Sequence, residues 1–478
     1  MQECKIFISG QWRATSERLS VLNPYNNEPI GYTYLASEEN IEEAICSATE
    51  AFKEMRTVPS YKRAEALQKI ADGLKEKREE IARMITLESA KPITDARVEV
   101  ARAVNTFTIA SEEAKRIGGE FIPLDLMSGS EGRQGLTRRV PIGPIVGISP
   151  FNFPLNLVAH KVAPAIAAGN TIILKPAPKT PLTALMLAEI IASTDLPTGA
   201  VQVFSTTNML AEKMVIDPRI KMLTFTGSAA VGWSLKEKCN KKRVLLELGG
   251  NAGVMIHSDA DLAYAARRCV AGSFSYAGQV CISVQRIYIQ AACYQSFLDR
   301  FLPQVESLIV GNPIDEKTNI PPMINLDAAK RVAAWIDEAV ASGAKVLAGG
   351  QWVGSVMIPT VLANTTPAMK VNCEEIFGPV VTVSPYEHLN EAIAAVNQSP
   401  YGLQAGIFTR DIQAVFEAFE QTEVGGLIVN DVPTYRVDHM PYGGMKESGV
   451  GREGISYAIR EMTELKLLAL NLQSLSRC

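Results

Sequence analysis

The sequence is poor in histidine and has no closely spaced pair of cysteines. Its four histidines stand at positions 160, 257, 388 and 439, and no two of its eight cysteines are spaced as Cys-x-x-Cys. Structural zinc sites and redox-active disulfides need such clusters, so we expect no metal site and reduced thiols. The Gly-x-Ser-x-Gly elbow is also missing. Metallohydrolases and serine hydrolases are therefore poor candidates.

The chain also lacks an excess of positive charge and an unbroken apolar span. Lysine and arginine number 47 against 51 acidic residues, which disfavours a nucleic-acid partner or an anionic membrane surface. The longest uncharged stretch, 140–160, contains Pro141, Pro144, Pro150 and Pro154, so we expect buried strand and loop there. The N-terminus has no signal-peptide pattern, which predicts a cytoplasmic protein.

A length of 478 residues predicts more than one domain. Apolar residues at helical spacing predict helices over 38–55, 60–87 and 93–116. Short apolar strands then alternate with helices in two series, one on each side of Gly250. The predicted strands are 145–149, 171–175, 201–205, 222–226 and 244–248, then 253–256, 286–290, 345–348, 380–384, 406–409 and 426–430. This alternation is typical of parallel α/β sheets and places a domain boundary near Glu247.

Two strand-like segments, within 119–140 and 459–478, stand outside both series. Unpaired strands usually find a partner, often in another subunit. We therefore expect a homo-oligomer, either a homodimer or a homotetramer.

The most informative residues are Cys281, in Gly278-Gln-Val-Cys281, and Glu247, in Glu247-Leu-Gly-Gly250. A thiolate can attack an electrophilic carbon, and a carboxylate can draw a proton from water to clear the resulting thioester. Each residue also has an ordinary structural interpretation. A cysteine is often a small buried apolar residue, and a strand-end glutamate is usually ion-paired.

Three loops follow predicted strands at the carboxyl edge of the first sheet, where open α/β sheets bind ligands. Asn152 can donate to a developing oxyanion or can shape an Asx-turn. Lys175 can contact a ribose or phosphate or can remain a solvated charge. Gly227 and Ser228 open a helix whose free N–H groups suit a pyrophosphate. Together these loops favour a nucleotide site.

One motif is misleading. Residues 449–454 match Gly-x-Gly-x-x-Gly, but no convincing strand precedes them and only 24 residues follow. That is too short for a βαβ unit, so we reject the match as a dinucleotide fingerprint.

Taken together, the segments resemble the aldehyde dehydrogenase superfamily from nearly end to end. The motifs that carry the resemblance are Pro150-Phe-Asn-Phe-Pro154, Lys175-Pro, Phe225-Thr-Gly-Ser228, Glu247-Leu-Gly-Gly250, Gly278-Gln-Val-Cys281, Glu374-Glu-Ile-Phe-Gly-Pro379, Pro441-Tyr-Gly-Gly444 and Lys446-x-Ser448-Gly449. The resemblance implies an α/β fold with a Rossmann-like cofactor domain (1–118 and 141–246), a catalytic domain (247–440) and a bridging oligomerisation β-arm (119–140 and 459–478).

The resemblance also implies roles. Cys281 would attack an aldehyde, Asn152 would stabilise the oxyanion and Glu247 would activate water. The implied cofactor is NAD(P). Its expected binding residues are Ser149, Pro150, Phe151, Lys175, Pro178, Lys179, Gly227, Ser228, Val231, Leu248, Gly249, Glu375 and Phe377.

Two departures from the family pattern concern the cofactor. Pro178 and Lys179 stand where an acidic residue usually follows the cofactor lysine, and 205–208 replaces a glycine-rich loop beside the adenine. A carboxylate there would repel a 2′-phosphate. Its absence admits NADP, for which Lys179 is a candidate partner.

The substrate is expected to be a small polar aldehyde. The chain looks closest to the lactaldehyde, succinate-semialdehyde and non-phosphorylating glyceraldehyde-3-phosphate dehydrogenases. Candidate substrate residues are Arg102, Asn156, Val280, Ile282 and Arg436. Each arginine can bind an anionic or hydroxylated tail of the substrate. The alternative is that both form salt bridges with a purely structural role. Val280 stands where phosphate-using members carry arginine, which disfavours a phosphorylated substrate.

Other functions remain open. A CoA-acylating relative would release the thioester to CoA, but such enzymes typically lack the base that Glu247 supplies. A thiol esterase would turn over without cofactor. A binding or structural role would not need the intact set of Cys281, Glu247 and Asn152.

Converting Pro178 to Glu should weaken NADP relative to NAD, because the new carboxylate would face the 2′-phosphate. The measurement is kcat/KM for each cofactor in wild type and variant. An unchanged preference would place the ribose pocket elsewhere.

Overall fold

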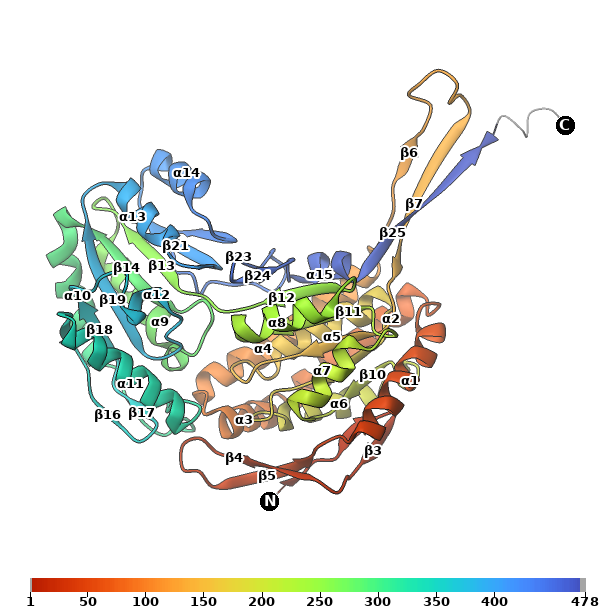
Figure 1. Cartoon of the computed structure of the whole chain (residues 1–478), viewed down its shortest axis with the longest axis horizontal. Coiled ribbons are helices and arrows are strands. Elements are labelled where there is room, and N and C mark those ends of the chain that lie inside the picture. Colours follow the sequence, from red (N-terminus) through yellow and green to blue (C-terminus); the bar gives the residue numbers. More distant parts are fainter. Residues whose placement is uncertain (1, 473–478) are drawn as a thin grey trace.

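The computed structural model describes residues 2–472, and it shows an α/β chain with two large sheets and a projecting arm (Figure 1). The first sheet has eight strands, parallel in the middle and antiparallel at both edges. Its order is β24 (Gly449–Val450), β12 (Arg243–Glu247), β11 (Met222–Thr226), β8 (Ile145–Ile148), β9 (Ile172–Lys175), β10 (Val201–Val203), β2 (Ile6–Ile8) and β3 (Gln11–Arg13).

Helices cover both faces of this sheet. One face packs on α2 (Ser60–Glu76), α3 (Arg78–Ser89), α4 (Ile93–Ala114), α5 (Asn156–Ala168), α6 (Leu182–Ala192) and α15 (Ile455–Glu461). The other face packs on α1 (Glu38–Met55), α7 (Asn208–Ile216) and α8 (Ala229–Cys239). Successive side chains of a strand point to opposite faces, so Ile172 and Leu174 enter the first core and Ile173 the second. Burial on both faces explains why the strands are apolar without alternation.

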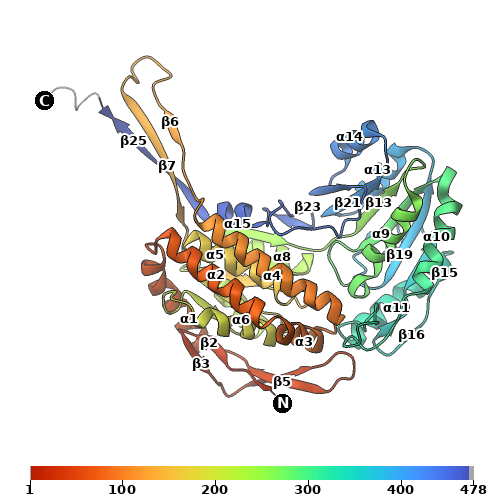
Figure 2. The ribbon, with the colours of Figure 1, turned by 180° about the vertical axis from the view of Figure 1, so that it is seen from behind.

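The second sheet has seven strands, all parallel except the first. Its order is β15 (Lys345–Ala348), β18 (Thr360–Ala363), β19 (Val380–Tyr386), β14 (Val284–Gln290), β13 (Ala252–Ile256), β21 (Gln404–Phe408) and β22 (Gly426–Val429). Helices α9 (Leu262–Phe274), α10 (Tyr294–Glu306) and α11 (Leu326–Ala341) pack on one face, and α13 (Leu389–Asn397) and α14 (Ile412–Gln421) on the other. Seen from behind, the two units lie side by side with their sheets in separate bodies (Figure 2).

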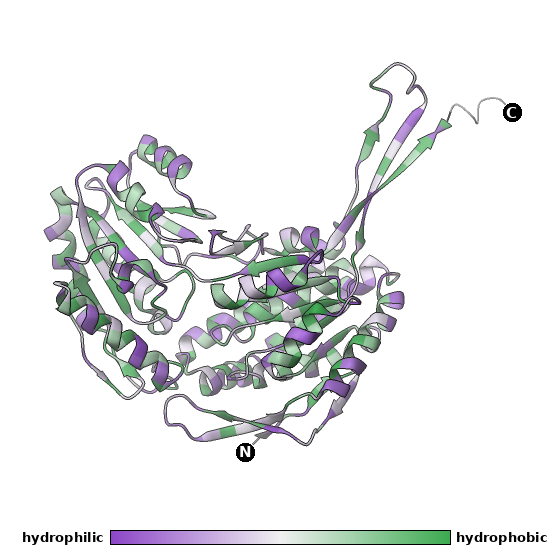
Figure 3. Cartoon of the chain, viewed as in Figure 1, coloured by the Kyte–Doolittle hydropathy of each residue, from purple (hydrophilic) through white to green (hydrophobic). Residues whose placement is uncertain are grey.

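The arm is a three-stranded sheet in the order β25 (Thr463–Asn471), β7 (Arg133–Pro141) and β6 (Phe121–Pro123). It stands away from the body, and apolar colour covers β6 and much of β25, whereas β7 is partly hydrophilic (Figure 3). Leu465, Leu467 and Leu468 are each more than half exposed. Residues 473–478, the end of the predicted arm segment, lie outside the described residues, as does Met1.

Smaller elements complete the chain. They are β1 (Gln2–Glu3), β4 (Arg18–Leu22) and β5 (Pro29–Tyr34) in one sheet, the pairs β16 (Trp352–Val353) with β17 (Val356–Met357) and β20 (Tyr401–Gly402) with β23 (Met445–Lys446), α12 (Lys370–Cys373), and the 3₁₀ turns η1 (Ser275–Gly278) and η2 (Ala291–Cys293). No helix within 2–472 is long and apolar enough to span a bilayer.

Three sequence expectations need correction. The helix predicted over 60–87 is two helices, because the chain leaves helical geometry at Lys77. The strands before residue 38 and β18 were not anticipated, since most are short and lack a strong apolar pattern. Strand β15 belongs to the second sheet but runs antiparallel, at its edge.

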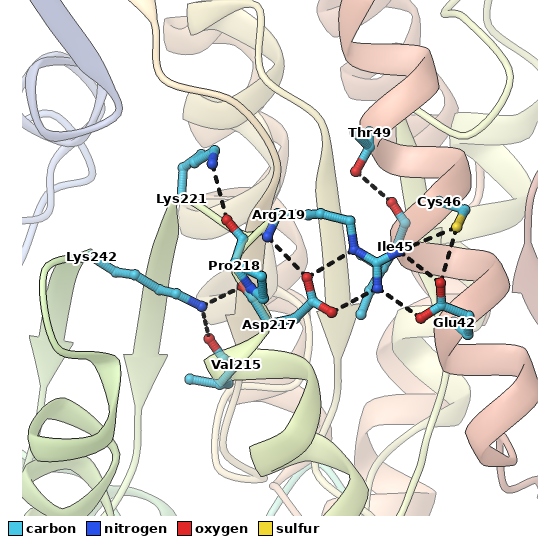
Figure 4. A network of polar contacts seen from close by, with 10 residues as sticks. All are labelled: Glu42, Ile45, Cys46, Thr49, Val215, Asp217, Pro218, Arg219, Lys221 and Lys242. Carbon is cyan, nitrogen blue, oxygen red and sulfur yellow. Dashed lines mark hydrogen bonds and ion pairs between the residues drawn. The ribbon is translucent and has the colours of Figure 1, made fainter.

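An exposed charge network ties α1 to the loop after α7 (Figure 4). The Arg219 guanidinium donates to both carboxylate oxygens of Glu42, at 2.7 Å each, and to Asp217 at 2.6 and 2.9 Å. These bonds lower the pKa of Glu42 to about 2 and also lower the pKa of Asp217. Bidentate geometry makes this one of the stronger surface ion pairs of the chain.

Arg219→Ala should lower the melting temperature at pH 7 by roughly 1 to 3 °C. The folded-state pKa values of both carboxylates are depressed, so their stabilisation is present above the unfolded value and is lost as the pH falls through about 2. The deficit should therefore shrink between pH 7 and pH 3.5. Arg410→Ala, which removes an exposed arginine with no ion pair among the described residues, is the matched control. An equal deficit at both pH values would contradict the electrostatic account.

Candidate active site

Six of the predicted site residues, Cys281 among them, line a cavity of about 380 Å³ between the two large sheets. Its walls come from α4, the start of α5, the loop after η1 and the segment 434–442. A hollow of about 570 Å³ elsewhere is lined by Arg286, Tyr386 and their neighbours and by none of the predicted site residues. The larger of the two cavities is therefore not the one that contains the predicted nucleophile, Cys281.

Close backbone contacts bring three predicted motifs together. A side chain at Gly250 would meet the carbonyl oxygen of Cys281 at 2.0 Å, and one at Gly278 would meet the carbonyl oxygen of Gly378 at 2.2 Å. Gly278 also has a φ of +68°, in the left-handed region that disfavours other residues. The turns that carry Glu247, Cys281 and Glu375 therefore pack directly on one another.

Asn152 lies against the loop that carries the thiol. Its side-chain amide Nδ2 donates to the carbonyl of Gln279 at 3.0 Å, and Gln279 Oε1 in turn accepts from the N–H of Ile324. The Asn152 side chain is buried, and its Oδ1 has no hydrogen-bond partner among the described residues. The second N–H of the Asn152 amide is therefore free to donate to a ligand. A side chain that only shaped an Asx-turn would not need a free N–H.

Glu247 ends β12 and is 2% exposed. Neither carboxyl oxygen has a hydrogen-bond partner among the described residues, and a side chain at Gly443 would lie 2.8 Å from Oε1. Burial, with the nearby charge of Glu453, raises the pKa of Glu247 well above its ordinary value. Within the described residues, Glu247 therefore does not form the ion pair that a strand-end glutamate usually makes.

A buried charge cluster lies behind Glu247, and the sequence interpretation missed it. Lys161 Nζ contacts Glu453 Oε1 at 3.4 Å and donates to Thr226 Oγ1 at 2.7 Å, while Arg436 donates to Glu453 Oε2 at 3.0 Å. Lys161 and Glu453 are fully buried. The available signal was a single lysine in helix α5, whose other residues are apolar except Asn156 and His160.

The Cys281 thiol lies 3.2 Å from the hydroxyl of Tyr442. Burial raises the pKa of Cys281 to about 11, although the Tyr442 hydrogen bond and the Arg436 charge both lower it. Its backbone N–H donates to no group of the described chain, so it is available to an oxyanion. The ring of Tyr442 packs with Ile282 and Leu403 in a small apolar cluster.

The predicted cofactor residues lie along the carboxyl ends of β8, β9, β11 and β12. Lys175 is buried at the end of β9, and burial lowers its pKa. Its ammonium makes no hydrogen bond or ion pair within 2–472. Ser149 Oγ is likewise buried without a partner, whereas Pro178 and Lys179 are exposed on the loop after β9.

A second group of these residues frames the same edge. Ser228 precedes α8 without a side-chain cap bond, which leaves the first N–H groups of the helix for a phosphate, and Val231 is exposed on its first turn. The N–H of Gly227 donates to the carbonyl of Glu247 at 3.1 Å. Leu248 and Gly249 continue into the turn, where Gly249 accepts from Ser448 Oγ at 2.7 Å.

The Glu375 and Phe377 segment closes the cofactor side. Glu375 Oε1 accepts from the N–H of Gly250 at 3.0 Å, and burial raises its pKa to about 7. The ring of Phe377 meets that of Phe151 edge-on at 5.9 Å, and its backbone has a φ of +49°. Pro150 and Phe151 are partly exposed beside it. Buried orphan polar groups, a free helix N-terminus and aromatic edges fit a dinucleotide.

All five candidate substrate residues line the cavity. Arg102 donates to Asp438 at 2.8 Å, and Asn156 donates to the same Oδ1 at 3.1 Å. Arg102 and Arg436 are both ion-paired, to Asp438 and Glu453, yet the Nε–H of each is buried with no hydrogen-bond partner within 2–472. Val280 and Ile282 flank the thiol with apolar surface.

Other lining residues were not anticipated. Lys91 and Glu99 form a buried ion pair, and the Lys91 ammonium lies 3.5 Å from the ring centre of Phe153. Glu99 also accepts from the N–H groups of Leu155 and Asn156, so it anchors the start of α5 just after Asn152. No cluster of three or more potential metal ligands occurs within 2–472.

Comparison with known proteins agrees with this geometry. The model of the aldehyde dehydrogenase family matches residues 12–468. The chain is 46% identical over 468 residues, 98% of each chain, to the 3-sulfolactaldehyde dehydrogenase of Priestia aryabhattai. Its structure matches aldehyde dehydrogenase 21 from Physcomitrella patens, solved with the reaction product succinate, with a TM-score of 0.97, 44% identity and 98% of each chain covered.

A third match concerns the cofactor. The glyceraldehyde-3-phosphate dehydrogenase of Methanocaldococcus jannaschii, solved with NADP, matches with a TM-score of 0.92 and 38% identity over 96% of this chain and 100% of that one. The resemblance drawn from the motifs, the α/β fold class and the NAD(P) cofactor are thereby confirmed. The chain belongs to the aldehyde dehydrogenase family, whose members oxidise aldehydes with NAD(P).

Proposed function

We propose that the protein oxidises a small aldehyde with an anionic tail to its carboxylic acid, through a thioester on Cys281 that water hydrolyses. The observation that carries this proposal is that the Cys281, Asn152 and Glu247 loops meet, and that Cys281 lines a cavity that Arg102 and Arg436 also line. The first sheet would bind the cofactor and the second would carry the thiol.

In the first step the Cys281 thiol loses its proton to solvent, the sulfur bonds to the aldehyde carbon, and the carbonyl π pair moves to oxygen. The free N–H of Asn152 Nδ2 and the backbone N–H of Cys281 stabilise that oxyanion. NAD(P), when bound, supplies the two-electron oxidation by accepting the hydride from the same carbon. Residues Lys175, Glu375 and Ser228 would hold the cofactor for this transfer.

In the second step Glu247 removes a proton from water, the hydroxide adds to the thioester carbon and the carbon–sulfur bond breaks. The acid leaves and the thiolate returns. A glutamate with a raised pKa gains its base form as the pH rises, so hydrolysis should accelerate with pH. An intact Glu247 also argues against release to CoA, the main alternative.

The tail of the substrate is inferred from the cavity and from the relatives. Arg102 and Arg436 each have an unused Nε–H group with which to bind a carboxylate or sulfonate. Because each arginine is also ion-paired, the empty site contains no uncompensated positive charge from either of them. One relative is named for a sulfonated aldehyde, and the plant enzyme was solved with succinate. Both observations favour an anionic tail over a neutral one.

Assembly and cofactor preference complete the proposal. Leucines exposed along β25 suit a partner strand, so we propose a homodimer or homotetramer joined through the arm. Pro178 and Lys179 favour acceptance of NADP. The cytoplasmic location stays a prediction from the sequence.

Succinic semialdehyde should give a kcat/KM at least tenfold above that of butanal, its neutral analogue of equal length, because only the former meets the two guanidinium groups. Reduced cofactor at 340 nm is the measurement, with NAD and NADP and with and without CoA. Arg102→Gln should remove most of this advantage through KM, and Arg102→Lys should keep part of it.

Cys281→Ala is the control for that assay and should abolish cofactor reduction. Full turnover in this variant would remove the proposed nucleophile. Equal kcat/KM for the charged and neutral aldehydes would reject the anionic tail, and reduction that depends on CoA would favour the acylating alternative.

Glu247→Gln should keep the pre-steady-state burst of reduced cofactor and lower the steady-state rate by about 10²-fold or more, because the thioester then lacks its base. Stopped-flow absorbance at 340 nm separates the two phases. The wild-type steady-state rate should rise with pH, while the variant should show a weaker dependence. A normal steady-state rate in the variant would exclude Glu247 as the base.

A further inference from the structure

The hydroxyl of Tyr442 is the only side-chain hydrogen-bonding group of the described residues that contacts the Cys281 sulfur, at 3.2 Å. With a neutral thiol either atom can be the donor. Once the proton is lost the sulfur can only accept, so the bond must then run from the hydroxyl to the thiolate.

The position of Tyr442 is fixed from two sides. Its backbone exchanges both hydrogen bonds with Glu453, at 3.1 and 2.6 Å. The guanidinium of Arg436 lies 3.6 Å from the centre of its ring and is held by the Glu453 carboxylate. Tyr442 is 3% exposed. Its hydroxyl therefore has little freedom to turn away from the sulfur.

The Arg436 contact also changes the chemistry of the hydroxyl. A cation on the ring face withdraws electron density, which makes the phenol a better donor. Burial and the nearby Cys281 nevertheless raise the pKa of Tyr442 well above its ordinary value. The phenol therefore keeps its proton and acts as a donor, while the thiol proton leaves to solvent.

The other charges around Cys281 act in opposite directions. Glu247 at the end of β12 and Glu375 after α12 disfavour the thiolate, whereas Arg436 favours it. Among the other residues that line the cavity, Lys91, just before α4, and Arg102, on α4, are compensated by Glu99 and Asp438. The thiolate thus depends on the 434–442 segment both for its hydrogen-bond donor, Tyr442, and for the cation that favours it, Arg436.

We propose that Tyr442 is a further catalytic residue, whose hydroxyl donates to the Cys281 thiolate and holds its sulfur in place for attack on the aldehyde carbon. This inference rests on the proposed role of Cys281 as the nucleophile. In this proposal the hydroxyl of the Pro441-Tyr-Gly-Gly444 turn has a chemical role. A phenylalanine at position 442 could not perform it, because phenylalanine has no hydroxyl group.

The test follows the rate of Cys281 alkylation by iodoacetamide against pH, in which the sulfur–carbon bond forms and iodide leaves. Mass spectrometry of the Cys281 peptide reports the rate without any need for turnover, and the exposed Cys46 is the internal reference. In Tyr442→Phe the apparent pKa should rise by about one unit, so that alkylation at pH 7 slows about tenfold. The pre-steady-state burst should slow similarly at pH 7 and recover as the pH rises.

Two further variants make the result decisive. Tyr61→Phe, the same change on the exposed face of α2, should leave the alkylation profile unchanged. Replacement of Tyr442 by 3-fluorotyrosine keeps the shape but makes the phenol a stronger donor, and should lower the apparent pKa. An unshifted profile in both Tyr442 variants would overturn the proposal. Normal alkylation without cofactor reduction on any aldehyde would instead count against the proposed function alone.

Discussion

The carbonyl of Cys281 lies so close to Gly250 that no side chain fits between them, and this backbone contact determines the geometry of the whole site. It joins the turn at the end of β12, which belongs to the first sheet, to the loop that precedes β14 in the second. Because interiors are close-packed, a methyl group at Gly250 would force the two units apart. The turns of Glu247 and Cys281 are thus held by packing of backbone on backbone, and Asn152 joins them through its hydrogen bond to the carbonyl of Gln279.

Charge buried behind this contact sets the chemistry. Lys161 and Arg436 compensate Glu453, while the Glu247 carboxyl group beside them has no hydrogen-bond or ion-pair partner in the described part of the chain. A carboxyl group in that position resists ionisation, and a buried thiol does so as well. Burial therefore raises the pKa of both groups, and Tyr442 and Arg436 are the groups that favour the thiolate.

Much of the fold could be predicted because apolar strands and amphipathic helices alternate in a regular way. The helix over 38–55 has the predicted ends, since Ser37 and Asn40 form a capping box and the apolar spacing is clear. The break at Lys77 could not be predicted, because the apolar pattern runs through it. Strand β24 escaped notice for another reason. Its two residues gain their role only by pairing with β12, far away in the sequence.

Motifs on the chain were sufficient to name the family, the cofactor class and the candidate residues Cys281, Glu247 and Asn152, because each motif is local and its residues are chemically distinctive. Contacts between distant segments were not contained in any motif. The Tyr442 hydroxyl meets the Cys281 sulfur across 161 residues, and Lys161 meets Glu453 across 292. The sequence by itself determined which chemical groups are present. Only the tertiary structure decided which of them are buried together, and burial is what sets their protonation and their partners.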